Sequence, residues 1–258
     1  MPQKPAPLPP AERLPDVPYA VDPKIERLIF ICGLHRGGTT LLERLLAARY
    51  ELSCLRASVP ESEGQHMQSV YVAARQYGGP GRFAFSRDMQ TDLEILTDYT
   101  ACRKQIMQEW AQFVTGDGSV LLEKSPPNLT KIWWLRRVFP GAMFIIMARD
   151  PRAVAAATQK WSKNSLAELM MHWNVAYSQA MTDFREDDCI MLRYEDLMQN
   201  PDAEIARLAD ILRLMPRQDP ILLEERYREI RSSNDEYITM HAGTRYGAGI
   251  WNHFGYEV

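Results

Sequence analysis

The sequence has few cysteines and no long apolar run. Its 258 residues include four cysteines, and none of them forms a C-x-x-C pair: Cys32, Cys54, Cys102 and Cys189. This spacing argues against a zinc site and against a disulfide framework, and it favours reduced thiols in the cytoplasm. No apolar stretch reaches the roughly 20 residues of a membrane-spanning helix. The N-terminus also lacks the charged start and apolar core of a signal peptide. We therefore expect a cytoplasmic protein without a membrane span.

The chain also lacks an excess of charge of either sign. Its 30 lysines and arginines nearly balance 33 aspartates and glutamates, so the net charge is −3. Such a balance provides no basic field for nucleic acid. A length of 258 residues with 46% hydrophobic content fits one α/β domain with a sizeable core.

Proline is concentrated at one end of the chain. Residues 1–23 contain eight of the 17 prolines. A segment with this composition favours an extended chain over regular structure. We therefore predict an extended Pro-rich arm over residues 1–23 and a single folded domain over residues 24–258.

The stretch from Arg27 to Leu46 predicts a strand, a tight turn and a helix. Its sequence is RLIFICGLHRGGTTLLERLL. The apolar run to Cys32 is typical of a buried parallel strand, and the leucines after Thr40 recur on one helical face. Glycines let the backbone approach a ligand, and the first amides of the helix attract an anion. The stretch therefore predicts a site for a phosphate-like group.

This turn lacks the lysine of the nucleoside-triphosphate loop G-x-x-x-x-G-K-[ST]. Gly33 and Gly38 have the expected spacing, but Thr39 occupies the lysine position, and the nearest cation is Arg36. Enzymes that use ATP need that lysine on the β and γ phosphates. The loop thus predicts an anion site of another kind, and a nucleotide kinase is the weaker alternative.

The rest of the chain alternates apolar runs with helical patterns. Strands alternating with helices imply a parallel sheet with helices on both faces, as in P-loop proteins. We predict an α/β fold of this kind, a three-layer sandwich with a central parallel sheet. Strands are expected near 28–32, 51–57, 120–122, 142–148 and 189–193, and helices near 39–46, 67–77, 91–114, 129–139, 153–161, 166–184 and 201–212.

Unusual polar residues follow several of these expected strands. Besides the loop at 33–36, they are Glu61 to His66, Lys124-Ser125 and Arg149-Asp150. Ligands of open α/β sheets bind past the carboxyl ends of the strands. These clusters are therefore expected to meet on one rim of the sheet.

Together these segments resemble the sulfotransferases that use 3′-phosphoadenosine 5′-phosphosulfate (PAPS), with motifs similar to those of bacterial, glycan and tyrosyl-protein members. In that family the loop carries Lys or Arg where Arg36 stands, often followed by Ser-Gly-Thr-Thr, and here Gly37 replaces the serine. The resemblance covers about residues 28–214. It implies that the loop binds the 5′-phosphosulfate through Leu34, His35, Arg36, Gly37, Gly38, Thr39 and Thr40.

The resemblance also suggests catalytic residues. The segment Glu123-Lys124-Ser125-Pro126 is similar to the E-K-[ST]-P segment of glycan sulfotransferases, whose lysine lies by the transferring sulfate. A glutamate soon after the second strand is the base in similar enzymes, which indicates Glu63 or Glu61. Aryl sulfotransferases use a histidine, so His66 competes. A catalytic group of this kind contributes roughly 10²–10⁴ in rate. Glu63 is preferred because it precedes Gly64 and an expected helix start.

A second family segment concerns the 3′-phosphate. There a strand delivers an arginine, matched by Arg149, and the next helix delivers a serine, where this chain has Ala157. Thr158 is the nearest hydroxyl, but one step along a helix turns a side chain by ~100°. The resemblance further suggests Tyr194 near the nucleotide and Arg245 in a closing C-terminal segment. A structural ion pair of Arg149 with Asp150 or Glu195 is the alternative role.

The sequence thus predicts transfer of a sulfuryl group from PAPS to a hydroxyl acceptor by in-line displacement, leaving adenosine 3′,5′-bisphosphate. No metal is expected. The acceptor stays open among glycan, lipid, peptide tyrosine and small molecule, and a homodimer is also left open. A nucleotide kinase or a non-catalytic nucleotide-binding module is the alternative function.

Overall fold

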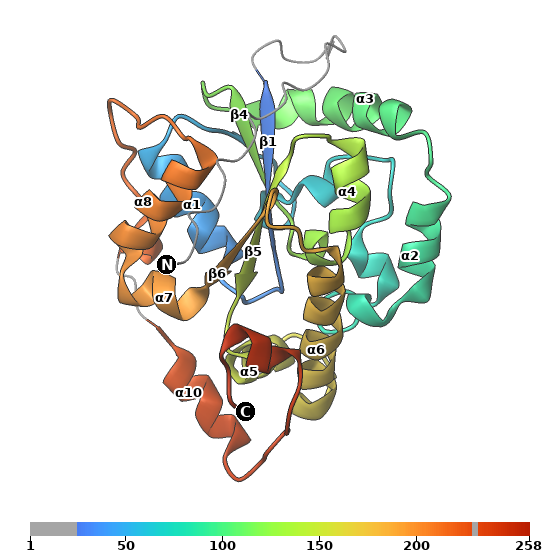
Figure 1. The fold of residues 1–258 in the computed structure, drawn as a ribbon, viewed down its shortest axis with the longest axis vertical. Helices are drawn as coiled ribbons and strands as arrows, with labels where there is room; N and C mark the ends of the chain where they lie inside the picture. Colours follow the sequence, from blue (N-terminus) through green and yellow to red (C-terminus); the bar gives the residue numbers. More distant parts are fainter. Residues whose placement is uncertain (1–24, 229–231) are drawn as a thin grey trace, which may run out of the picture.

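A computed structural model describes residues 25–228 and 232–258 of the chain. The predicted arm over residues 1–23 lies outside the described residues. Strands and helices alternate along the chain, as predicted, and a sheet of six strands runs through the middle of the molecule (Figure 1). Its order is β3-β2-β4-β1-β5-β6. The strands are β1 (Arg27–Gly33), β2 (Ser53–Leu55), β3 (Val114–Thr115), β4 (Val120–Lys124), β5 (Met143–Ala148) and β6 (Cys189–Arg193).

All strand pairs are parallel except the pair at one edge, where β3 runs antiparallel to β2. The sequence predicted a purely parallel sheet and missed this short strand. Its two residues, Val114 and Thr115, show too little alternation to be recognised, and they pair with Leu55 and Cys54 from a distant part of the chain. Gly116, whose φ is 103°, then turns the chain away from β3.

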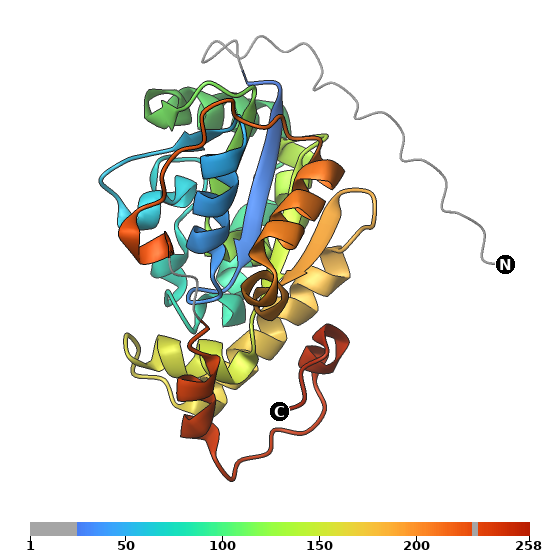
Figure 2. The ribbon, with the colours of Figure 1, turned by 90° about the vertical axis from the view of Figure 1, so that its left-hand side faces the viewer.

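Helices cover both faces of the sheet, which gives the predicted three layers (Figures 1 and 2). α1 and α8 cover one face, and α3, α4 and α6 lie on the other. The helices are α1 (Thr39–Arg49), α2 (Arg87–Glu94), α3 (Tyr99–Trp110), α4 (Ile132–Val138), α5 (Pro151–Gln159), α6 (Leu166–Asp183), α7 (Tyr194–Gln199), α8 (Pro201–Leu212), α9 (Glu225–Arg228) and α10 (Asn234–Ile238).

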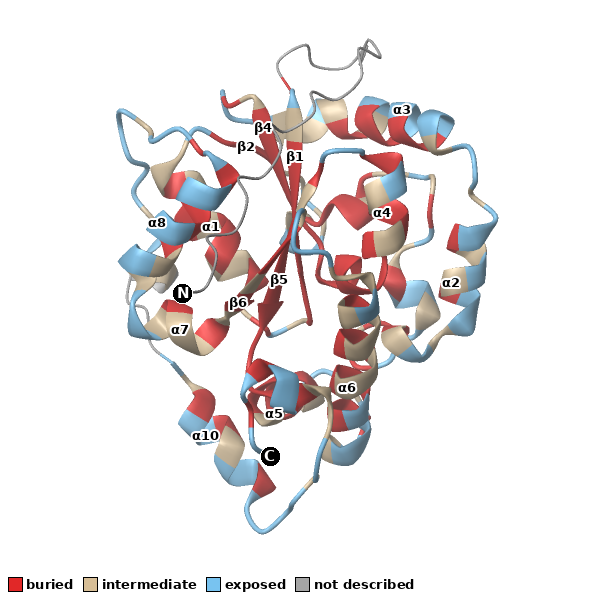
Figure 3. Ribbon diagram, viewed as in Figure 1, coloured by how far each residue is buried: buried red, intermediate tan, exposed pale blue. Residues whose placement is uncertain are grey.

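The alternation of side chains along β1 divides the core in two. Leu28 and Phe30 pack with Trp134 and other residues on the side of α4, whereas Ile29 packs with Leu45 on the side of α1. The buried residues of Figure 3 therefore lie along both faces of the strands. Burial on both faces explains why the central strands appear in the sequence as continuous apolar runs.

Local signals fix the helices that begin at the carboxyl ends of the strands. The Asp150 side chain accepts a hydrogen bond from the Arg152 N–H, and Pro151 occupies the first position of α5. Ser165 and Glu168 form a reciprocal capping box at the start of α6. Within the described parts of the chain, no helix is long and apolar enough to cross a membrane.

The helix predicted over residues 67–77 is wrong. Only Ala74–Tyr77 forms a short 3₁₀ turn there. The Gln68 side chain exchanges hydrogen bonds with the backbone of Tyr71, and the Gln65 Oε1 accepts the Ala74 N–H at 3.0 Å. These side chains take backbone groups that a helix would have paired internally. The segment is therefore an irregular loop near the carboxyl ends of β2 and β4.

Candidate functional site

The loop after β1 has the backbone that a phosphate-binding turn requires. Gly38 has φ 95°, and a Cβ there would lie 2.7 Å from the Tyr194 ring. A Cβ at Gly33 would lie 2.8 Å from the Met147 carbonyl oxygen. Both positions therefore need glycine. Helix α1 then begins at Thr39 without a side-chain cap, so its first N–H groups are available to an anion.

A cavity of about 390 Å³ opens at this point. It lies past the carboxyl ends of the strands, where the sequence placed the polar clusters. Most of the predicted residues of the loop reach it, together with both candidate glutamates, Arg149 and Tyr194. The residues that line it are His35, Arg36, Gly38, Thr39, Thr40, Leu41, Glu61, Glu63, Pro126, Arg149, Trp161, Tyr194, Tyr227 and Ser233.

Arg36 is the exposed cation of the loop. Its guanidinium lies over the Trp161 ring, 4.6 Å from the ring centroid. Trp161 is itself 63% exposed at the cavity wall. Among the described residues, no carboxylate forms a salt bridge with Arg36. An arginine held only by an aromatic face can turn to an anionic ligand without breaking an ion pair.

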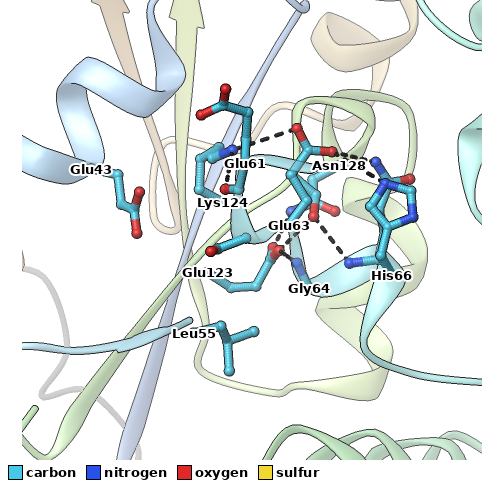
Figure 4. Close-up of polar contacts among 12 residues, drawn as sticks. Glu43, Leu55, Glu61, Glu63, Gly64, His66, Glu123, Lys124 and Asn128 are labelled. Atoms are coloured by element: carbon cyan, nitrogen blue, oxygen red, sulfur yellow. Dashed lines mark hydrogen bonds and ion pairs between the residues drawn. The ribbon is translucent and has the colours of Figure 1, made fainter. Parts of the chain in front are cut away.

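Glu63 lines the cavity and forms a buried pair with Lys124. Lys124 Nζ lies 3.5 Å from Glu63 Oε1, and the two side chains are 1% and 6% exposed. Lys124 also donates to the Glu61 carbonyl oxygen at 3.1 Å, while the Glu61 carboxylate is exposed and points away from the pair (Figure 4). A buried carboxylate beside a cation is suited to take a proton next to a developing negative charge.

The two histidines near Glu63 are both shifted toward the neutral form. His66 Nε2 lies 3.9 Å from Glu63 Oε2, and burial together with Arg75 lowers its pKa. Burial also lowers the pKa of His35 to about 4, and its buried Nδ1 has no hydrogen-bond partner among the described residues. His66 does not line the cavity, so the geometry places Glu63 rather than His66 at the cavity surface.

Arg149 is held at the cavity wall by neutral groups. It donates to Asn234 Oδ1 at 2.8 Å, to Ser233 Oγ at 3.1 Å and to the Arg36 carbonyl oxygen at 3.0 Å. Its guanidinium also lies 4.4 Å from the Tyr194 ring centroid. The ion pairs considered for Arg149 are not found among the described residues, because Asp150 pairs with Arg152 and Glu195 accepts from Asn234 and Tyr256.

Seven predicted site residues do not line this cavity: Leu34, Gly37, His66, Lys124, Ala157, Thr158 and Arg245. Ala157 and Thr158 are buried in α5, and Thr158 faces a separate space of about 10 Å³ that His172 and Leu34 also line. Arg245 is exposed and does not line the cavity. Thr158 therefore does not replace the family serine in this geometry. Leu34 and Gly37 shape the loop, because the Gly37 N–H donates to the Leu34 carbonyl oxygen at 2.9 Å.

Sequence reasoning missed Trp161, Tyr227, Ser233 and Asn234. Trp161 follows α5, and the other three come from the C-terminal segment that returns to Arg149. Ser232-Ser233-Asn234 is a typical helix-start sequence and could have predicted α10. No local signal places that helix against a strand end some 85 residues earlier.

Comparison with known proteins gives a consistent result. A model of a family described as the sulfotransferase family matches residues 28–218. Protein-tyrosine sulfotransferase A of Caenorhabditis elegans is 26% identical over 229 residues, which cover 81% of this chain and 56% of the relative. Protein-tyrosine sulfotransferase 1 of Danio rerio is 26% identical over 211 residues, covering 77% and 56%. The chain thus spans about half the length of these relatives.

Two solved structures have a similar fold. The sulfotransferase domain from the Synechococcus PCC 7002 olefin synthase aligns with a TM-score of 0.55 at 19% identity, over 91% of this chain and 96% of that one. The sulfotransferase domain from the curacin biosynthetic pathway aligns with a TM-score of 0.52 at 15% identity, over 90% and 98%. These likenesses support the predicted α/β fold.

Proposed function

Because the chain belongs to the sulfotransferase family, we propose that it transfers a sulfuryl group from PAPS to the hydroxyl oxygen of an acceptor. In this reaction the bond from sulfur to the acceptor oxygen forms as the bond from sulfur to the 5′-phosphate oxygen breaks. The acceptor proton passes to a base, and adenosine 3′,5′-bisphosphate leaves. A protein serves such a reaction chiefly by positioning the reactants and neutralising charge.

One observation carries the proposal. Glu63 lines the same cavity as Arg36 and the uncapped first turn of α1, and Lys124 lies 3.5 Å from Glu63 in a buried pair. A base and a cation therefore lie beside an anion site that has no P-loop lysine. A kinase of nucleotides would require that lysine at position 39, where the chain has threonine.

Each residue then has a defined task. The N–H groups at Thr39 and Thr40, with Arg36, bind the 5′-phosphosulfate. Lys124 stabilises the charge that grows on the bridging oxygen, and Glu63 takes the acceptor proton. The residues fit an anionic donor, because Arg36 and Arg149 both face the cavity without a carboxylate partner among the described residues.

The 3′-phosphate needs a contact that Ala157 cannot provide. Arg149 supplies one charge-assisted donor, and Ser233 Oγ lies 3.1 Å from its Nη2 at the same wall. We assign to Ser233 the hydroxyl contact that the family places on the helix after the arginine. A Ser233→Ala variant should lose up to about tenfold in affinity for adenosine 3′,5′-bisphosphate, the value of one neutral hydrogen bond.

The acceptor is proposed as a hydroxyl, with a peptide tyrosine as the first candidate because the similar curated proteins are named protein-tyrosine sulfotransferases. Glycan, lipid and small phenol remain alternatives for the assay. A metal-free reaction and a cytoplasmic location stay predictions from the sequence, and a homodimer is left open.

The test is transfer of labelled sulfate from PAPS to a panel of tyrosine peptides, glycans, lipids and phenols. Glu63→Gln should lower the transfer rate by roughly 10²–10⁴, because it keeps the shape and loses the basicity. Its affinity for adenosine 3′,5′-bisphosphate should not change. Glu61→Gln is the matched control and should keep a near-normal rate.

Two results would contradict the proposal. Normal transfer by Glu63→Gln would move the role of base to Glu61 or His66, and His66→Asn would then decide between them. Thermal stabilisation by Mg-ATP alone, with none by adenosine 3′,5′-bisphosphate in EDTA, would support the nucleotide kinase instead. Adenosine 3′,5′-bisphosphate at a free concentration of 100 times its dissociation constant should add about 2.7 kcal/mol to the free energy of unfolding.

A further inference from the structure

We infer that Glu123 is a positioning residue that holds the catalytic loop in place, an inference that rests on the proposed role of Glu63 as the base. Glu123 is the penultimate residue of β4 and is 1% exposed. It does not line the cavity, so it cannot itself reach an acceptor. Its carboxylate instead lies against the loop that carries Glu63 (Figure 4).

The Glu123 carboxylate collects three donors. Oε1 accepts the Gly64 N–H at 2.9 Å and the Ser125 hydroxyl at 2.6 Å, and Oε2 accepts the Asn128 amide. Burial raises the pKa of Glu123 above its ordinary value, and these hydrogen bonds together with Lys124 offset part of that rise. A buried carboxylate with a donor on each oxygen is held in one orientation.

These bonds continue to Glu63 itself. Ser125 Oγ accepts the Gln65 N–H at 3.2 Å, and the Gln65 side chain donates to Glu63 Oε2 at 2.6 Å. Two consecutive backbone amides after the base are therefore tied to the end of β4. On the opposite side of the loop, the Trp110 ring N–H donates to the Gly64 carbonyl oxygen at 3.0 Å.

Gly64 is the residue that permits this approach. A Cβ at that position would lie 2.7 Å from Glu123 Oε1 and 2.9 Å from Leu55 Cδ1. Any side chain would therefore displace the carboxylate or the loop. Position 64, which follows Glu63, therefore requires glycine because the Glu123 carboxylate lies directly against it.

Adjacent residues of β4 thus hold the loop on both sides of Glu63. Glu123 accepts from the residue that follows the base, and Lys124 donates to the carbonyl of Glu61, two residues before it. The glutamate of the Glu-Lys-Ser-Pro segment sets the position of the base, while its lysine supplies the charge. A displacement of about 1 Å can lower a catalysed rate by ~10²-fold.

The experiment compares two substitutions of Glu123. Glu123→Met removes the acceptor for the Gly64 N–H and should lower kcat by ~10²-fold, while the Kd for adenosine 3′,5′-bisphosphate stays within about twofold. Glu123→Gln keeps one acceptor oxygen. Asn128 Oδ1 has no partner among the described residues and can accept the new amide after a flip. This variant should therefore recover most of the rate.

A double variant separates positioning from general support of the fold. In a Glu63→Gln background, Glu123→Met should add little further loss, because both changes act through the same base. The inference would be overturned if the fall in kcat of the double variant equalled the product of the falls in the two single variants. It would also be overturned if Glu123→Met lowered kcat and nucleotide affinity by the same factor. If Glu123→Met does not fold, Ser125→Ala removes the acceptor for the Gln65 N–H and one donor to Glu123, leaves the Gly64 bond in place, and should show the same selective fall in kcat, to a smaller extent.

Amide hydrogen exchange provides a measurement that does not depend on transfer. Protection of the Gly64 N–H should fall in Glu123→Met and persist in Glu123→Gln and Glu63→Gln. Unchanged protection in Glu123→Met would show that the bond does not hold the loop. If the native protein transfers no sulfate while the Gly64 amide responds as expected, the proposed function fails and the structural link remains.

Discussion

The two walls of the cavity are stabilised in different ways. The donor wall, formed by residues 33–40 and Arg149, is fixed by backbone geometry at the ends of β1 and β5. The base wall is formed by residues 59–66, whose only regular structure is 3₁₀ turns, and is backed by Lys124; side-chain hydrogen bonds hold it to β4. The donor wall should therefore be sensitive to added volume, and the base wall to lost polar atoms as well as to added volume at Gly64.

The largest effect is expected on the base wall. Lys124→Met removes the only cation that forms a salt bridge with Glu63 among the described lysines and arginines. Its rate of sulfate transfer should fall by ~10²–10³-fold, the cost of losing one charge-stabilising group. The affinity for adenosine 3′,5′-bisphosphate should change little, because that product carries no sulfuryl group. Single-turnover transfer and equilibrium nucleotide binding measure the two quantities.

Lys131→Met is the matched control for this prediction. Lys131 is also buried, but it lies over the Tyr71 ring at 4.2 Å and, among the described residues, forms no salt bridge with Glu63. Burial lowers its pKa to about 8. Its loss should leave the transfer rate within about tenfold of the native value. Equal losses in both variants would mean that burial of charge, rather than contact with Glu63, determines the rate.

A smaller effect is expected on the donor wall. Arg149→Ala should lower the affinity for PAPS by roughly 10- to 100-fold relative to the affinity for adenosine 5′-phosphosulfate. The two donors differ by one 3′-phosphate, and a charge-assisted contact to it contributes about 1.5–3 kcal/mol of binding free energy. Arg36→Ala should weaken both donors, since it binds the group they share. Competition binding of both nucleotides measures this. Equal losses in Arg149→Ala would make Arg149 structural, with Arg245 the next residue to test.

The smallest effect concerns the stability of the fold at acid pH, which depends on a buried histidine behind the donor wall. His172 is 3% exposed, and burial lowers its pKa from 6.5 to about 3. The unfolded chain therefore binds a proton at a pH where the folded chain does not. Stability is full above pH 6.5 and falls below it, by at most about 1.4 kcal/mol per pH unit for each such histidine.

Urea unfolding between pH 5 and 7 tests this dependence. His35, with a pKa of about 4, contributes in the same direction. His172→Gln should reduce the slope of unfolding free energy against pH. An unchanged slope in this variant would show that the burial of His172 does not prevent its protonation.

The two walls also differ in how far the sequence predicts them. Arg36 and Lys124 follow apolar runs that fix strand ends, so their meeting at one rim follows from local patterns. The base wall depends on Gln65 and Glu123, whose hydrogen bonds join segments about 60 residues apart. No local pattern reports such bonds. The helix over 67–77 was wrongly predicted because Gln65 and Gln68 bind backbone groups of the segment itself, and Ser233 was missed because it contacts Arg149, which is 84 residues earlier.

The hydrogen bond from Arg149 to the carbonyl oxygen of Arg36 has an evolutionary consequence. It joins the two arginines of the donor wall across β1 and β5, and Arg36 has φ 66°, in the left-handed region that non-glycine residues seldom adopt. Replacement of Arg149 therefore also removes a support of that backbone turn. Because the acceptor is a backbone carbonyl, which every residue has, a change at position 36 can keep this bond, whereas a change at position 149 removes it. Nucleotide preference and support of the loop are therefore inherited together through Arg149.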